Sequence, residues 1–173
     1  MNIFLIGFMG TGKSTISAVL GKELSTEVIE MDELIVKRQG MPISQIFETR
    51  DEEYFRELET GLLVELQQRD GVIVSCGGGT PMRECNVAEM KKSGIIVLLT
   101  ARPETIFERV RYSHNRPLIE HNKTVEYIAE LLEKRREKYE AAADVTIATD
   151  GKDTREICRE IQDSVKEWEK QSC

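Results

Sequence analysis

The chain has 173 residues, a length typical of one domain, so we expect a single folding unit over residues 1–173. With 31 acidic against 24 basic side chains, the net charge is -7, which disfavours nucleic acid and anionic membranes as partners. No apolar run approaches the roughly 20 residues of a membrane-spanning helix, and the amino terminus lacks the charged leader of a signal peptide. We therefore expect a cytoplasmic protein and, without a long apolar surface stripe, a monomer.

Five short runs rich in β-branched residues follow one another along the chain, at 3–6, 28–29, 72–74, 95–99 and 145–148. Helix-length amphipathic segments separate them. Because parallel strands are joined by helical crossovers and buried on both faces, this alternation predicts a three-layer α/β fold with a five-stranded parallel sheet between helices. Ligands are then expected at the carboxyl ends of the strands.

Residues at the expected helix ends support this interpretation. Asp153 precedes Glu156 by three residues, the spacing of a capping box, and the last helix is expected to run to about Lys170. Gly94 stands between a helical pattern and the strand at 95–99. No interdomain linker or internal repeat interrupts the pattern, so every motif is expected to belong to one folding unit.

The four cysteines are far apart in the sequence and form no CxxC pair, and the chain has two histidines. This spacing disfavours a zinc site and a disulfide framework, so we expect four thiols. Cys76 ends an apolar run and is interpreted as a small buried side chain rather than a nucleophile.

A glycine-rich loop follows the first strand. Residues 7–14 read GFMGTGKS and match GxxxxGK[ST], with a helical segment at 15–24 behind them. Such a loop directs backbone N–H groups at phosphates, and the helix N-terminus adds partial positive charge. Lys13 is placed to reach the β- and γ-phosphates of ATP, and the Ser14 hydroxyl to bind Mg²⁺. The predicted nucleotide contacts in the loop are Gly10, Thr11, Gly12, Lys13, Ser14 and Thr15.

A phosphate-binding loop is shared by kinases, GTPases and ATPases, so other motifs must separate these classes. A GTPase would need DxxG for its switch, and no Asp of this chain has Gly three positions on. Residues 122–125 read NKTV and lack the aspartate of the guanine motif [NT]KxD. A GTPase switch is therefore disfavoured.

Further motifs follow the loop in a fixed order. They are EMD at 30–32, FRELE at 55–59, GGG at 77–79, RPL at 116–118, KR at 134–135 and Tyr139. With the glycine loop, these blocks make residues 3–139 resemble the shikimate kinases. The resemblance implies a P-loop kinase fold with strand order 2-3-1-4-5, a mobile lid at about 111–123 and a shikimate-binding region at about 32–59. It also implies transfer of the γ-phosphoryl group of ATP to the 3-hydroxyl of shikimate, giving shikimate 3-phosphate and ADP, a step of aromatic amino acid biosynthesis.

The resemblance implies that Asp32 binds substrate hydroxyls and orients the one that is phosphorylated or accepts its proton. The alternative is that Asp32 caps a helix beginning near Glu33. Two residues upstream the family commonly has an aspartate near Mg²⁺, whereas this chain has Glu30. Glu30 could reach the metal through water, because Mg²⁺ usually keeps several waters.

Two arginines are implied for the substrate carboxylate, Arg56 and Arg135. Glu59 lies three residues after Arg56, so on a helix it can hold the guanidinium in one rotamer. A planar guanidinium can form two parallel hydrogen bonds to a carboxylate, which an ammonium cannot. Gly78 and Gly79 are implied to border the pocket. The alternatives are an ordinary surface pair for Arg56 and Glu59 and a solvated basic helix face for Arg135.

The polar segment 111–123 is interpreted as the lid. Its Arg116 is implied to neutralise charge on the transferring phosphoryl group, and Arg109 to stack on adenine. His114 and His121 are interpreted as solvated loop residues. Beyond Tyr139 the resemblance fades, so adenine contacts at 149–153 are unassigned.

Two alternatives stay open from the sequence. One is another small-molecule kinase of this fold, such as a gluconate or nucleoside monophosphate kinase. The other is a non-catalytic nucleotide-binding module. Turnover of ATP with shikimate, but not with gluconate or a nucleotide, would separate them.

Overall fold

The computed structural model describes residues 1–111 and 124–173. The predicted lid therefore lies outside the described residues except for Arg111, and Arg116, His114 and His121 lie outside them as well.

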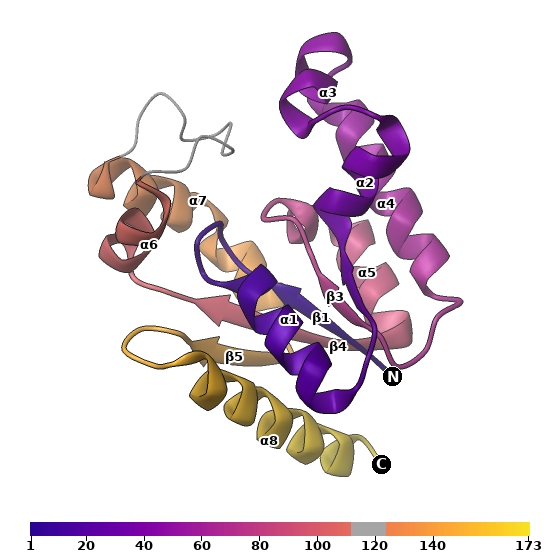
Figure 1. Ribbon diagram of the computed structural model, residues 1–173, viewed down its shortest axis with the longest axis vertical. Coiled ribbons are helices and arrows are strands. Elements are labelled where there is room, and N and C mark those ends of the chain that lie inside the picture. Colours follow the sequence, from indigo (N-terminus) through magenta and orange to yellow (C-terminus); the bar gives the residue numbers. More distant parts are fainter. Residues whose placement is uncertain (112–123) are drawn as a thin grey trace.

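A five-stranded parallel sheet forms the centre of the molecule, in the order β2-β3-β1-β4-β5 (Figure 1). The strands are β1 (Asn2–Ile6), β2 (Val28–Glu30), β3 (Ile73–Ser75), β4 (Gly94–Thr100) and β5 (Val145–Ala148). Each coincides within a residue or two with a β-branched run of the sequence. The expected strand order and parallel arrangement are confirmed.

Helices connect consecutive strands and lie on both faces of this sheet (Figure 1). They are α1 (Lys13–Leu24), α2 (Met31–Gln39), α3 (Ile43–Thr49), α4 (Glu52–Leu66), α5 (Glu84–Ser93), α6 (Pro103–Val110), α7 (Val125–Ala142) and α8 (Thr154–Ser172), with a short 3-10 helix η1 (Thr80–Met82). No helix in residues 1–111 or 124–173 is long and apolar enough to cross a membrane.

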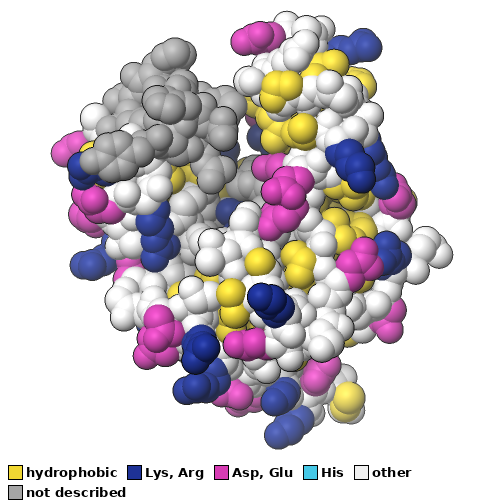
Figure 2. Space-filling model, viewed as in Figure 1, with side chains coloured by type: hydrophobic (Ala, Val, Ile, Leu, Met, Phe, Trp, Pro, Cys, Tyr) yellow, Lys and Arg dark blue, Asp and Glu magenta, His cyan; other side chains and the backbone are white. Residues whose placement is uncertain are grey.

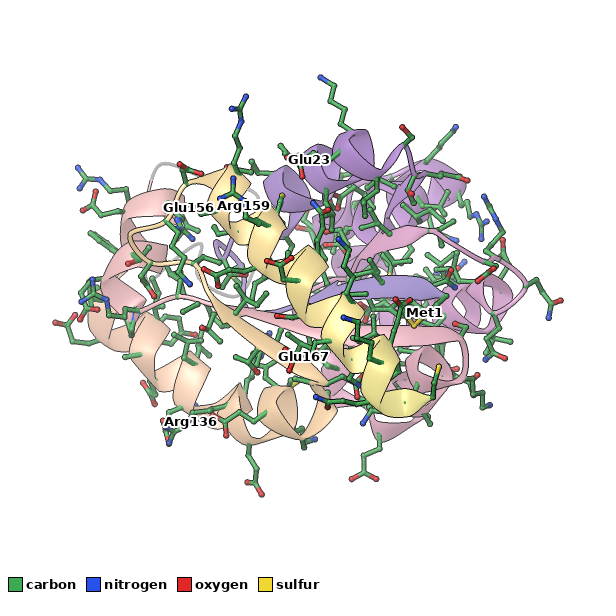
Figure 3. All side chains as sticks on the ribbon, turned by 90° about the horizontal axis from the view of Figure 1, so that it is seen from below. Met1, Glu23, Arg136, Glu156, Arg159 and Glu167 are labelled. Atoms are coloured by element: carbon green, nitrogen blue, oxygen red, sulfur yellow. The ribbon has the colours of Figure 1, made fainter. Side chains whose placement is uncertain are left out.

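Alternate residues of a strand belong to two separate hydrophobic cores, one on each face of the sheet, because successive side chains of a strand point to opposite faces. Phe4 and Ile6 pack with α4, α5 and α7, whereas Leu5 packs with α1 and α8. The α8 face toward the sheet carries Ile157, Cys158, Ile161 and Val165. Figure 3 shows α8 crossing this face of the sheet, with Glu156, Arg159 and Glu167 on its outer side.

The predicted capping box at the start of α8 is confirmed. The Asp153 carboxylate accepts a hydrogen bond from the Glu156 N–H at 2.9 Å, and the Glu156 carboxylate accepts one from the Asp153 N–H at 2.8 Å. Each bond satisfies a backbone donor that the helix itself leaves without a partner. The helix continues to Ser172, two residues beyond the expected end.

The carboxyl ends of β1, β2 and β3 lie beside one another, because Ser75 is in register with both Leu5 and Glu30. The segments that follow these strands therefore meet at one edge of the sheet: the glycine loop, the start of α2, and residues 76–79. Helices α2 and α3 project beyond this edge (Figure 1).

Candidate active site

A cavity of about 1190 Å³ opens at this edge. Its walls come from the glycine loop, α2, α3, α4 and the segment after β3, with single arginines from α6 and α7. Apolar side chains gather on the part of the surface formed by α2 and α3 (Figure 2). Of the predicted site residues in the described part of the chain, all but Thr11 line the cavity. The lining site residues are Gly10, Gly12, Lys13, Ser14, Thr15, Glu30, Asp32, Arg56, Glu59, Gly78, Gly79, Arg109 and Arg135.

The glycine loop ends at the N-terminus of α1. Gly12 precedes the helix with φ 96°, a left-handed conformation that side-chain-bearing residues rarely adopt. The buried Thr11 hydroxyl donates to the Phe8 carbonyl at 2.8 Å, so Thr11 closes the loop on itself instead of facing the cavity. Lys13 Nζ donates to the Gly7 carbonyl at 2.7 Å and to the Phe8 carbonyl at 3.0 Å. The loop thus has the helix end and the lysine that phosphates require.

Three oxygen-bearing side chains from α1 and β2 form a second feature of the cavity. The Ser14 hydroxyl donates to one Glu30 carboxylate oxygen at 3.2 Å, and the Ser17 hydroxyl lies 3.1 Å from the other. This set fits a hard cation, because Mg²⁺ prefers oxygen donors and completes its shell with water and phosphate. Among the described residues, no group of three or more His, Cys, Asp or Glu side chains is arranged so that it could hold a metal ion.

Asp32 is the second residue of α2, directly after β2. The residue that precedes the helix is Glu30, so the helix-capping alternative for Asp32 is wrong. The strand passes into the helix without a capping loop. Asp32 Oδ1 and Glu59 Oε2 both lie close to Gly77: a Cβ built there would be 2.9 Å from each. The carboxylates of α2 and α4 therefore converge beside the segment that follows β3.

Arg56 and Glu59 form an ion pair on α4, with 2.6 Å between Arg56 Nη1 and Glu59 Oε1. The Arg56 side chain is 15% exposed and that of Glu59 is fully buried, so this is not an ordinary surface pair. Burial would lower the pKa of Arg56, but Glu59 and then Glu52 raise it above its ordinary value. A Cβ on Gly79 would lie 2.5 Å from both Nη atoms of Arg56, so glycine is required for the guanidinium to lie there.

Arg135 reaches the same cavity from α7. Its guanidinium lies 5.8 Å from the centroid of the Phe8 ring and 3.5 Å from the Tyr139 hydroxyl. That hydroxyl donates to the Gly78 carbonyl at 2.6 Å, which joins α7 to the glycine segment after β3. A Cβ on Gly78 would lie 3.6 Å from Arg135 Nη1 and 3.7 Å from the Gly7 carbonyl oxygen. Gly78 therefore separates Arg135 from the glycine loop.

Arg109 extends from α6 along the other side of the glycine loop. Its Nη1 donates to the Gly10 carbonyl at 2.9 Å and to the Thr149 hydroxyl at 3.2 Å. Thr149 in turn donates to the Thr100 carbonyl, which ties the segment after β5 to the end of β4. Sequence reasoning did not assign Thr149 a role, because its partners lie at least 40 residues away.

Cys76 is one of the residues that line the cavity, but it is almost fully buried, and burial raises the pKa of its thiol. Its interpretation as a small buried side chain is confirmed. Sequence reasoning missed the buried residues Thr80 and Asn86, which bond to the site from η1 and α5. The position of Thr80 directly after the three glycines was the one signal available for it.

The sheet order, the glycine loop at the end of β1 and the cationic side chains around it define a P-loop kinase fold. The model of the shikimate kinase family matches residues 9–166. A shikimate kinase from Dehalococcoides mccartyi is 39% identical over 99% of this chain and 97% of its own length. The chain belongs to the shikimate kinase family, whose members are ATP-dependent kinases.

Solved structures agree with this family. A shikimate kinase from Acinetobacter baumannii in complex with shikimate superposes with a TM-score of 0.88 at 33% identity, covering 93% of this chain and 90% of that one. A gluconokinase from Sinorhizobium meliloti 1021 has a TM-score of 0.62 at 20% identity, covering 96% of this chain and 91% of that one. This second likeness extends to the fold alone, so it does not favour the gluconate kinase alternative.

Proposed function

We propose that this chain transfers the γ-phosphoryl group of ATP to the 3-hydroxyl of shikimate through the residues that line the cavity. The observation that carries the proposal is the buried Arg56–Glu59 pair, which lies in one cavity with the glycine loop and Arg135. Two guanidinium groups suit a carboxylate, and shikimate is a small carboxylic acid with hydroxyl groups. Catalysis then consists mainly of positioning and charge neutralisation.

The nucleotide half of the site is the glycine loop with Lys13. Backbone N–H groups of residues 10–15 hold the phosphates, and Lys13 turns from the loop carbonyls to the β- and γ-phosphates. Ser14 would hold Mg²⁺, with Glu30 acting through water, and the metal would supply positive charge against the phosphate oxygens. Arg109 stacks on adenine.

The acceptor half of the site lies between α2 and α4. Arg56 and Arg135 hold the substrate carboxylate, with Gly78 and Gly79 allowing close approach of the backbone. Asp32 orients the hydroxyl that attacks, or accepts its proton. For Arg116, which lies outside the described residues, the expected role is to neutralise charge on the transferring phosphoryl group.

As a whole, we propose a monomer that folds as one unit and acts in the cytoplasm. The acidic net charge of -7 supports the expectation that neither nucleic acid nor an anionic membrane is a partner. The molecular mass of the purified protein, measured by analytical ultracentrifugation, would test whether it is a monomer.

The substrate assignment is tested by comparing Arg56→Lys with Arg56→Ala. Lysine keeps the charge but loses the planar pair of donors. In both variants kcat/KM for shikimate should therefore fall, by an amount that corresponds to roughly 1.5 to 3 kcal/mol of lost transition-state stabilisation. Affinity for ATP should be unchanged. The wild type should also discriminate against an analogue whose carboxylate is a neutral carboxamide.

Two results would contradict the substrate assignment. Equal use of the carboxamide would show that the pocket does not recognise a carboxylate. Turnover of ATP with gluconate or a nucleotide instead of shikimate would favour another kinase of this fold, and no turnover with any acceptor would favour a nucleotide-binding module.

A further inference from the structure

The buried carboxylate of Glu59 is shared between two donors that come from different parts of the fold. Arg56 Nη1 donates to Oε1 at 2.6 Å from one turn away on α4. The Thr80 hydroxyl donates to Oε2 at 2.5 Å from η1, which follows the glycine segment after β3. Both Glu59 and Thr80 are fully buried. The orientation of the carboxylate toward Arg56 therefore depends on a donor outside α4.

Thr80 is itself held on both sides. Its N–H donates to the Gly77 carbonyl at 3.1 Å, and its carbonyl accepts from Asn86 Nδ2 at 2.8 Å. Asn86 is a fully buried residue of α5, and its Oδ1 accepts from the Thr60 hydroxyl of α4 at 2.7 Å. The chain of contacts thus begins and ends on α4, one residue apart. These bonds hold the backbone of Thr80 in place beside Glu59.

Removing the Thr80 hydroxyl would leave one oxygen of a buried carboxylate without this donor, which favours a different rotamer of Glu59. The guanidinium of Arg56 would then lose the partner that fixes its plane against Gly79. A carboxylate ligand that needs two parallel N–H donors is sensitive to that plane, whereas a neutral ligand is less so.

We propose that Thr80, anchored by Asn86, is a positioning residue that sets the affinity of the site for the substrate carboxylate by holding Glu59 toward Arg56. This inference depends on the proposed role of Arg56 in binding the carboxylate. Thr80 acts through Glu59 and need not touch the substrate, so its effect should appear in binding of the acid and not in the transfer step.

The test is Thr80→Val, which keeps the shape of the side chain and removes the hydroxyl. We expect the KM for shikimate to rise about tenfold, as for the loss of one hydrogen bond to a charged group, with kcat within about twofold of the wild type. The KM of the carboxamide analogue should change much less. Thr80→Ser, which restores the hydroxyl, should restore the KM for shikimate.

A matched control is Thr105→Val. Thr105 on α6 also donates from its hydroxyl to a carboxylate, that of Asp150 at 2.6 Å, but α6 and α4 lie on opposite sides of the molecule (Figure 1). This variant should leave the KM for shikimate unchanged. Thermal unfolding of each variant checks that the fold is kept, and Thr80→Ala removes the same donor if valine cannot be accommodated.

The outcomes separate this inference from the proposed function. If Thr80→Val, or Thr80→Ala, retains the full preference for shikimate over the carboxamide, Thr80 does not position the carboxylate site, while the role of Arg56 stands. An equal rise in KM for the acid and for the carboxamide would also overturn the inference about Thr80, because it would indicate a general structural effect. If the wild type itself shows no preference, the proposed role of Arg56 fails and this inference fails with it.

Discussion

Single charged side chains at the strand ends carry the chemistry that we propose, and Lys13 is the first of them to test. Lys13→Met removes the positive charge beside the phosphates without disturbing the core, so turnover should fall below detection. The midpoint of thermal unfolding should stay close to that of the wild type, because Lys13 is not part of the hydrophobic core and its ammonium donates to the Gly7 and Phe8 carbonyls of the loop. Near-normal kcat would contradict the role of the glycine loop.

Asp32 is tested by its amide. Asp32→Asn is nearly isosteric but cannot accept a proton or carry negative charge toward the hydroxyl, so phosphoryl transfer should be mostly lost while ATP binding is kept. Binding is measured by calorimetry and transfer by single-turnover kinetics. Transfer that survives within about threefold would show that Asp32 does not act on the acceptor hydroxyl.

Gly79 is tested against a glycine of the neighbouring helix. A Cβ on Gly79 would lie 2.5 Å from the Arg56 guanidinium, so Gly79→Ala should displace that group and raise the KM for shikimate. Gly61 in α4 meets nothing within 4 Å among the described residues, so Gly61→Ala should leave that KM unchanged. It should also stabilise the protein by about 0.5–1 kcal/mol, because glycine is a poor helix former. Equal KM values for the two variants would contradict the close approach.

Among the helices, α8 allows a test of stability that is separate from activity. Its capping box lies away from the cavity, so Asp153→Ala should lower the free energy of unfolding by about 1 kcal/mol and leave kcat and KM unchanged. Asp163→Ala, in the middle of the same helix, is the control, because no cap is lost there. Urea unfolding measures both variants, and equal stabilities would contradict the capping role.

The elements that sequence patterns predicted best are those set by local chemistry. The strands were predicted from β-branched runs, and the cap of α8 from two residues at fixed spacing. The capping alternative for Asp32 was wrong because local spacing does not reveal that β2 continues directly into α2. The division of residues 31–66 into three helices was not predicted either.

The exposure of the thiols follows from the packing of the entire molecule and gives a simple measurement. Cys76 and Cys158 are buried, and burial raises the pKa of both, to about 11 for Cys158. Cys85 and Cys173 are exposed. A thiol reagent at pH 8 should therefore modify two cysteines quickly in the folded protein and all four in denaturant. Fast modification of three or four in the native state would contradict the packing.

Contacts between distant segments were beyond the reach of sequence patterns. The bonds from Thr80 to Glu59 and from Tyr139 to Gly78 join residues 21 and 61 positions apart. The family resemblance indicated which residues meet in the cavity, because it carries the geometry of a known fold. It indicated that Glu59 holds Arg56, but not that Thr80 holds Glu59, since Thr80 and its partner Asn86 lie outside the motifs.

The position of Gly78 has a consequence for inhibitor design. The backbone of this one residue separates Arg135 from the glycine loop. A Cβ on Gly78 would be in van der Waals contact with both Arg135 Nη1 and the Gly7 carbonyl oxygen, so the two groups lie close together. A compound that joins an acidic ring to a phosphate mimic would therefore need only a short, stiff connection to occupy both halves. Short connections give a high effective concentration for the second half, so such a bisubstrate compound should bind far more tightly than either fragment.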